Sequence, residues 1–239
     1  EILIGLVGSE MCIRDRVDMV CDNFDDVIVI YNGANQFELG FTDEYPQIKS
    51  VVWCPGTGNV GFNALGKVFS GEVNPSGKTP DTFIYDMTTA PWWNNGEKIE
   101  YTNLADMAVE GMNAGSPQVY APAFTNYVEG IYVGYKYYET AAQEGFIDYD
   151  KTVQYPFGYG LSYTEFEQKM GELEEKDGQI SVDVEVTNTG DVAGKDVVEV
   201  YYNPPYTNGG IEKASANLIE FAKTDLLQPG DSQTVTVTF

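Results

Sequence analysis

The chemistry open to this sequence is limited by the side chains that it contains. Its 239 residues include no histidine, which excludes Ser-His-Asp and Cys-His catalysis, imidazole zinc sites and histidine pH sensing. Three cysteines without a CxxC pair exclude a cysteine-rich zinc site and a dense disulfide framework, and we expect Cys21 and Cys54 to be buried free thiols. Catalysis would have to use carboxylates, hydroxyls, Lys, Arg or aromatic groups, and no metal or other cofactor is indicated.

Carboxylates are the most abundant candidates for catalysis, with 37 Asp and Glu residues in the chain. Hydrolysis of a glycoside with retention needs two carboxyl groups about 5–5.5 Å apart across the bond. The sequence does not show which two of these carboxyl groups lie that close together. Glu129 lies in an aromatic stretch, Tyr127–Tyr135, where we interpret it as a hydrogen-bonded structural acid in preference to a catalytic one.

The aromatic content favours a neutral, polar ligand such as a sugar. The chain has 17 Tyr, 12 Phe and 3 Trp and a net charge of −24, which argues against binding nucleic acid or an anionic membrane. No apolar run approaches the roughly 20 residues that a membrane span needs. Trp53, Trp92 and Trp93 are the candidate substrate-binding residues, although a Trp at a strand end is commonly a core residue.

Two glycine-rich segments resemble nucleotide-binding motifs. Gly56-x-Gly58-x-x-Gly61 lies between an expected strand and helix, but the acidic residue at the required distance, Asp81, opens its strand instead of ending it. We therefore interpret these glycines as allowing a helix to pack closely on a strand and predict that no dinucleotide binds. The segment 71–79 departs from a P-loop in spacing and in element order, so we interpret it as a turn.

Hydrophobic patterns predict the elements that must position these residues. Val17, Val20, Cys21 and Phe24 have helical spacing, and the apolar runs 26–31 and 50–54 indicate strands buried in a parallel sheet. A helix is expected from residue 62 to a C′ glycine at Gly71, followed by a strand at 79–85. Residues 86–165 are rich in loops. This order predicts an α/β layered domain.

The pattern changes after about residue 172. Residues 180–187 alternate between apolar and polar side chains, as do residues 235–239, and 197–202 is a further expected strand. Turns at 188–191 and 229–231 separate these strands. Strands at this spacing predict a β-sandwich, cut at its C-terminal edge.

The first 16 residues contain a string that is unlike any protein family. Residues 11–16, MCIRDR, resemble translated sequencing-adapter read-through. We predict that residues 1–16 are a non-native scar that adds little structure, and we assign no compartment because the true N-terminus would then be missing.

Four segments, in this order, resemble glycoside hydrolase family 3, the β-glucosidase type. They are SGEVNPSGK at 70–78, EGIYVGYKYY at 129–138, YPFGYGLSY at 155–163 and VTNTGDVAGK at 186–195. The resemblance implies a three-layer α/β sandwich with a mostly parallel sheet at 17–166. It also implies a truncated immunoglobulin-like (fibronectin type III-like) β-sandwich at 167–239.

The family resemblance implies a retaining, exo-acting glycosidase that acts on oligosaccharides or glycosides. The nucleophilic Asp would lie on an N-terminal (β/α)8 barrel absent from this chain, and the acid/base Glu in a loop before the helix at Val17, where the scar stands. No catalytic residue is therefore assigned within 17–239. A non-catalytic carbohydrate-binding or adhesion module and a nucleotide-binding protein are the alternative hypotheses.

Overall fold

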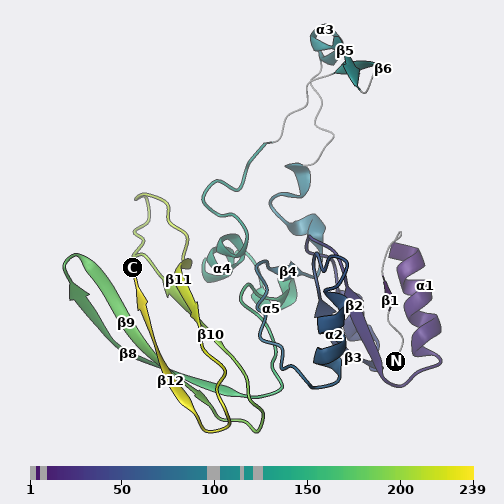
Figure 1. Ribbon diagram of the computed structural model, residues 1–239. Helices are drawn as coiled ribbons and strands as arrows, with labels where there is room; N and C mark the ends of the chain where they lie inside the picture. The colour runs from purple at the N-terminus through teal and green to yellow at the C-terminus, as the bar shows by residue number, and fades with distance from the viewer. Residues whose placement is uncertain (1–3, 6–9, 96–102, 114–115, 121–125) are drawn as a thin grey trace.

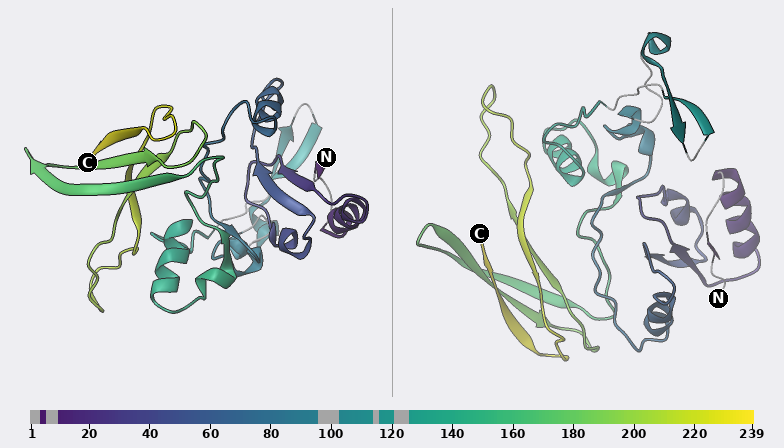
Figure 2. Two further views of the ribbon diagram at one scale, coloured as in Figure 1. Left: turned by 90° about the horizontal axis from the view of Figure 1, so that it is seen from below. Right: turned by 45° about the horizontal axis from the view of Figure 1, so that its top comes forward.

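The computed structural model describes residues 4–5, 10–95, 103–113, 116–120 and 126–239. Figures 1 and 2 show an α/β part, coloured purple to teal, beside a body of long strands coloured green to yellow. The strands predicted at 26–31 and 180–187 lie in different sheets, as expected. The α/β class predicted for the first part of the chain is confirmed.

A three-stranded parallel sheet forms the centre of the α/β part, in the order β1-β2-β3. Its strands are β1 (Ile4–Gly5), β2 (Val27–Tyr31) and β3 (Ile48–Trp53). Val27, Val29 and Ile30 of β2 are at most 5% exposed, which explains why its sequence is continuously apolar.

Helix α1 (Glu10–Cys21) packs against this sheet and begins earlier than predicted. Ile13 and Val17 are 4% and 1% exposed and lie in one core cluster with Val27 of β2. The prediction that residues 1–16 add little native structure is therefore wrong for β1 and for residues 10–16. The reason is that Ile13 extends the apolar stripe of Val17 and Cys21 by one turn.

Helix α2 (Phe62–Phe69) follows the glycine-rich segment. Gly71 has a φ of +76°, as expected for a C′ glycine. Gly56 and Gly58 have φ values of +58° and +59°, and a Cβ at either would meet no atom within 4 Å. The interpretation that these glycines permit close helix–strand packing is wrong for both, because it is the left-handed backbone that requires them.

The strand predicted at 79–85 is shorter and lies in a different sheet. Strand β4 (Phe83–Ile84) pairs antiparallel with β7 (Val153–Tyr155), so it adds nothing to the parallel sheet. Around this pair lie helices α4 (Tyr135–Gln143) and α5 (Tyr149–Thr152), together with short 3-10 turns. The turns are η1 (Gly40–Glu44), η2 (Met87–Thr89) and η3 (Trp93–Asn95).

The stretch expected to be rich in loops contains a helix and a hairpin. They are α3 (Leu104–Met107), β5 (Val109–Asn113) and β6 (Ser116–Tyr120), and the two strands pair antiparallel. Figure 1 shows this group standing apart from the rest of the chain.

The C-terminal part consists of two antiparallel sheets, ordered β12-β9-β8 and β10-β11. The strands are β8 (Phe166–Lys176), β9 (Gln179–Asn188), β10 (Val197–Tyr202), β11 (Asn217–Lys223) and β12 (Ser232–Thr238). One core cluster joins both sheets through Val184 of β9, Val198 of β10 and Val235 of β12. The period-2 pattern of β9 and β12 is thus explained by one buried face.

Candidate functional site

A cavity of about 420 Å³ lies beside Trp93, where the start of α1 meets the segment between β2 and β3. Its volume is in the range of small-molecule sites. Apolar, aromatic and charged side chains share its lining, which includes Arg14, Phe37, Glu38, Glu44, Tyr85 and Trp93.

Hydrogen bonds fix the wall formed by residues 37–44. Glu38 Oε1 accepts a hydrogen bond from the backbone N–H of Met87 at 2.5 Å. The Tyr85 hydroxyl donates to Asp43 Oδ2 at 3.1 Å, and the Gln154 amide donates to the carbonyl oxygen of Leu39 at 3.2 Å. An irregular segment is thereby held in one position without belonging to the sheet.

An ion pair lies on one side of the cavity. Arg14 Nη1 and Nη2 donate to the two carboxylate oxygens of Glu44 at 2.9 and 3.1 Å. The hydrogen bond from Arg14 holds the pKa of Glu44 below its usual value, so this carboxylate is ionised near neutral pH. With Glu38, the cavity offers both donors and acceptors for hydroxyl groups.

Of the three predicted tryptophans, the structure brings only Trp93 to this cavity. Its side chain is 46% exposed, and its ring lies 6.3 Å from that of Trp92, at 52°. Trp92 is half-buried and packs against the core cluster of Ile84 and Tyr138. One ring of the pair therefore faces solvent and the other contributes to packing.

Trp53 lies apart from this cavity, at the end of β3. Its indole N–H donates to the carbonyl oxygen of Gly33 at 2.7 Å, and its ring meets Phe83 edge-on at 5.0 Å. These contacts are those of a core residue with a satisfied polar group. A sugar contact by Trp53 stays a prediction.

Glu129 makes a hydrogen bond of the kind expected of a structural acid. Its Oε2 accepts a hydrogen bond from the Asn95 amide at 3.2 Å. Asp81, considered above as a nucleotide ligand, accepts a hydrogen bond from the neighbouring Thr82 N–H at 2.8 Å.

Of the two thiols expected to be buried, Cys21 is buried, as predicted. Cys54 is only half-buried, because it follows the end of β3.

Sequence reasoning missed Glu38, Arg14 and Tyr85 as cavity residues. Glu38 lies in an irregular segment without periodicity, and its partner Met87 is 49 residues away in the sequence. Arg14 lies in the segment 1–16 that the sequence analysis predicts to be a scar. Only Trp93 carried a signal, because a paired, loop-borne Trp is a recognisable candidate for sugar stacking.

The described residues contain neither a cluster of metal ligands nor a membrane-spanning helix. Within the ranges given above, no group of three or more His, Cys, Asp or Glu side chains could hold a metal ion. Over the same ranges, no helix has the length and apolar character needed to cross a membrane.

Comparison with known proteins identifies similar sequences along nearly the whole chain. The chain is 36% identical over 220 residues to a β-glucosidase of Ruminococcus albus, covering 91% of this chain and 19% of that protein. It is 35% identical to β-glucosidase A of Butyrivibrio fibrisolvens, covering 94% and 25%. The chain thus spans about a fifth to a quarter of the length of these relatives.

Solved structures and a family model agree with these matches. A crystal structure of a β-glucosidase from Paenibacillus barengoltzii superimposes with a TM-score of 0.75 at 34% identity, covering 94% of this chain and 22% of that one. The model of the glycosyl hydrolase family 3 C-terminal domain matches residues 12–135, about half of the chain. This chain belongs to glycosyl hydrolase family 3.

Proposed function

We propose that this chain is part of a retaining, exo-acting β-glucosidase-like enzyme that hydrolyses terminal O-glycosidic bonds. The observation that carries the proposal is the match to a solved β-glucosidase at 34% identity over 94% of this chain. The substrate would be an oligosaccharide or another glycoside.

The proposed enzyme needs a catalytic barrel in addition to this chain. Retaining catalysis requires a nucleophilic carboxylate and an acid/base held across one bond. The described parallel sheet has three strands, and the relatives are about four to five times longer than this chain. We therefore propose that a (β/α)8 barrel of the same protein supplies the nucleophile and that the 239 residues alone are inactive.

The proposed domain organisation follows the sequence prediction. Residues 17–166 would form the α/β sandwich domain in three layers and residues 167–239 a fibronectin type III-like domain, with 1–16 a scar. The core shared by the two C-terminal sheets supports the second domain, and the start of β8 at Phe166 supports the boundary.

Within the complete enzyme, we propose that the cavity beside Trp93 forms one wall of the sugar pocket. The half-exposed face of Trp93 would stack on a sugar ring, and the Glu38 side chain would hydrogen-bond its hydroxyls. The ring of Trp92 would pack against that of Trp93 and hold it in place. Trp53 would contact a sugar only at the rim of the pocket.

Exposed apolar side chains support a partner for this chain. Tyr127 and Val133 are 81% and 60% exposed, and Val60, before α2, is 73% exposed. Contact with the barrel would remove such surface from water.

A chimera tests the proposal. Residues 17–239 would replace the matching part of Butyrivibrio fibrisolvens β-glucosidase A, so that the relative's own sequence before this part, where the acid/base Glu is expected, is kept. Both chimera and isolated chain would be assayed on p-nitrophenyl β-glucoside. We expect turnover by the folded chimera only. Activity of the isolated chain that Glu38→Gln abolished would instead place the chemistry within these residues.

The role of Trp93 is tested in the same chimera. Trp93→Ala should raise KM roughly tenfold, equal to about 1.4 kcal/mol of lost binding. Phe146, 81% exposed and outside this cavity, is the matched control, and Phe146→Ala should leave KM unchanged. Equal effects of the two substitutions would contradict a specific sugar contact at Trp93.

A further inference from the structure

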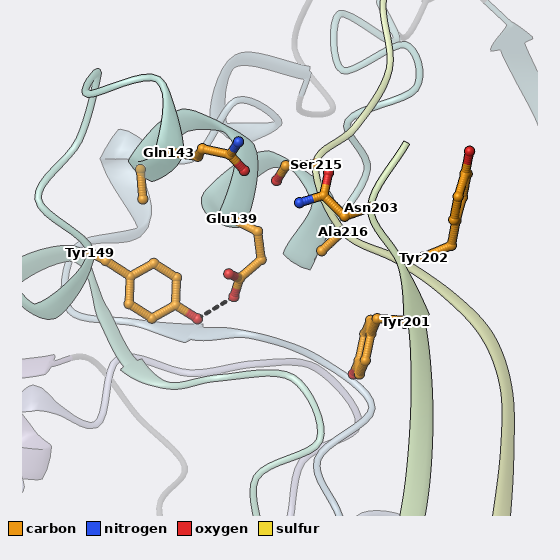
Figure 3. A pocket seen from close by; sticks show the side chains of 9 residues that line it. Glu139, Gln143, Tyr149, Tyr201, Tyr202, Asn203, Ser215 and Ala216 are labelled. Carbon is orange, nitrogen blue, oxygen red and sulfur yellow. Dashed lines mark hydrogen bonds between the residues drawn. The ribbon is translucent and has the colours of Figure 1, made fainter. Parts of the chain in front are cut away.

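A second cavity, of about 390 Å³, lies between α4 and the end of β10. Figure 3 shows it from close by, with residues of α4 on one side and those of the strand on the other. It shares no lining residue with the cavity beside Trp93. The lining residues used below are Glu139, Gln143, Tyr149, Tyr201, Asn203 and Ser215.

Two tyrosine rings in this cavity are held in place through their hydroxyl groups. The Tyr149 hydroxyl donates to Glu139 Oε1 at 2.6 Å, and the Tyr201 hydroxyl donates to Glu199 Oε2 at 2.7 Å. Burial, followed by these hydrogen bonds, raises the pKa of both tyrosines, so both remain protonated donors. The rings thus offer fixed apolar faces beside a carboxylate that retains a second oxygen as acceptor.

Two side-chain amides complete the polar lining. Gln143 and Asn203 are both exposed, and in Figure 3 they extend into the space between α4 and the strand. Each amide offers donors and an acceptor. Tyr202, the last residue of β10, also lines the cavity.

The walls of the cavity are joined across the α/β part and the C-terminal sheets. The Ser215 N–H donates to Thr140 Oγ1 at 3.0 Å, and the Leu218 N–H donates to the Tyr135 hydroxyl at 2.7 Å. The ring of Tyr135 also meets that of Tyr201 edge-on at 5.9 Å. The cavity is therefore formed by packing between residues that are far apart in the sequence.

The charge of the lining selects against anions. It contains one carboxylate, Glu139, and no Lys or Arg, so a phosphate or carboxylate group would find no counter-charge. The net charge of −24 for the whole chain acts in the same direction. Apolar ring faces beside amides and one acceptor suit an uncharged molecule with several hydroxyl groups, and the volume is within the range of ligand sites.

We propose that this junction cavity is a binding site for a neutral mono- or disaccharide, separate from the cavity beside Trp93. The sugar would lie against Tyr149 and Tyr201 and hydrogen-bond to Glu139, Gln143 and Asn203. Because the site draws on both parts of the chain, bound sugar would also stabilise their junction.

Titration of the purified 239-residue chain tests this site directly. Chemical-shift changes on adding cellobiose or methyl β-D-glucoside should map to α4 and the end of β10, whereas glucose 6-phosphate should bind far more weakly. Gln143→Ala and Asn203→Ala should each weaken sugar binding by about two- to tenfold, the effect of losing one hydrogen bond. Tyr206→Phe is the control and should leave the affinity unchanged, because Tyr206 is 47% exposed and does not line this cavity.

Two outcomes would overturn the proposal. One is the absence of shifts at α4 and β10 at sugar concentrations well above the millimolar range. The other is sugar binding that Trp93→Ala removes and Gln143→Ala and Asn203→Ala leave intact, which would assign the sugar to the first cavity. Turnover by the chimera is measured separately, so failure of this proposal and failure of the proposed enzyme function are distinguishable.

Discussion

At the scale of the residue, the buried Asn188 shows how one polar side chain joins several loops. It is fully buried, and its Oδ1 accepts from the Thr164 hydroxyl at 2.7 Å and from the Gly190 N–H at 3.1 Å. Its Nδ2 donates to the carbonyl oxygens of Val192 and Leu227 at 2.9 and 3.0 Å. All four hydrogen-bonding positions of the amide are satisfied, so its burial carries no unpaired group.

Replacing Asn188 should therefore be strongly destabilising. Asn188→Ala leaves two carbonyl oxygens, a hydroxyl and an N–H without these partners, and we expect the free energy of unfolding to fall by about 3 kcal/mol or more. Urea unfolding measures the change. Asn208→Ala, at an exposed turn, is the control and should change it by less than about 0.5 kcal/mol. A similarly small effect at Asn188 would show that the network does not form.

Asp81 provides a pH-dependent prediction. Burial raises the pKa of its carboxyl group, partly offset by the hydrogen bond from Thr82 N–H. A raised folded-state pKa means that ionisation costs the folded state free energy as pH rises through that pKa. Asp81→Asn keeps an oxygen acceptor without the charge, so we expect it to stabilise the protein at pH 7.

The gain from Asp81→Asn should disappear below the unfolded-state pKa of Asp, about 3.9, where the native carboxyl is protonated in both states. Urea unfolding at both pH values measures it. The exposed Asp191→Asn should show no such pH dependence. A stabilisation of equal size at both pH values would rule out the titration of Asp81 as its cause.

At the scale of the element, helix α1 depends on its buried stripe. Ile13, Val17, Val20 and Cys21 are each at most 6% exposed and share a core cluster with Leu39 and Phe83. On the outer side, the Tyr45 hydroxyl donates to Asp18 Oδ1 at 2.7 Å, which raises the pKa of Tyr45 to about 12. Tertiary contacts, more than local propensity, stabilise a helix of this length.

We expect slow hydrogen exchange in α1 from Arg14 to Cys21, because the first four N–H groups of a helix lack intrahelical partners. Ile13→Ala should lower the free energy of unfolding by about 2–5 kcal/mol. Met19, 62% exposed on the same helix, is the control, and Met19→Ala should have little effect. Fast exchange throughout this stretch would restore the interpretation of residues 1–16 as an unstructured scar.

At the scale of the whole molecule, the turn at residues 74–78 joins the two parts of the chain. Asn74 donates to the carbonyl oxygen of Ala193 at 3.1 Å and accepts from Ser162 Oγ at 2.9 Å and from the Tyr163 N–H at 2.8 Å. Lys78 Nζ lies 3.4 Å from Asp196 Oδ1. The segment that resembles a P-loop is thus a structural joint.

Asn74→Ala should weaken this joint by about 2 kcal/mol and separate the unfolding of the two parts. All three Trp residues lie in the α/β part, so their fluorescence reports on that part alone. We expect the fluorescence change to reach its midpoint at a lower urea concentration than the loss of amide-exchange protection in β9. Asn59→Ala, in an exposed loop, should leave the two midpoints together, and coincident midpoints in Asn74→Ala would contradict the role of the joint.

The sequence by itself determined the elements whose side chains follow a regular burial pattern. The apolar runs at 26–31 and 50–54 became β2 and β3, and the alternation at 180–187 became β9. Gly71 marked the end of α2 because a left-handed residue there favours glycine. The four segments that resemble family 3 also predicted the family correctly.

Only the tertiary structure decided the features that depend on contacts between distant residues. Strand β8 is exposed along nearly its whole length and has no buried alternation, so its pairing with β9 defines it. Strand β4 joined β7 instead of the parallel sheet, and Glu38 and Trp93 came to line one cavity although 55 positions separate their numbers in the chain. Local patterns report which face of an element is buried, whereas cavities and joints arise from long-range packing that leaves no periodic signal.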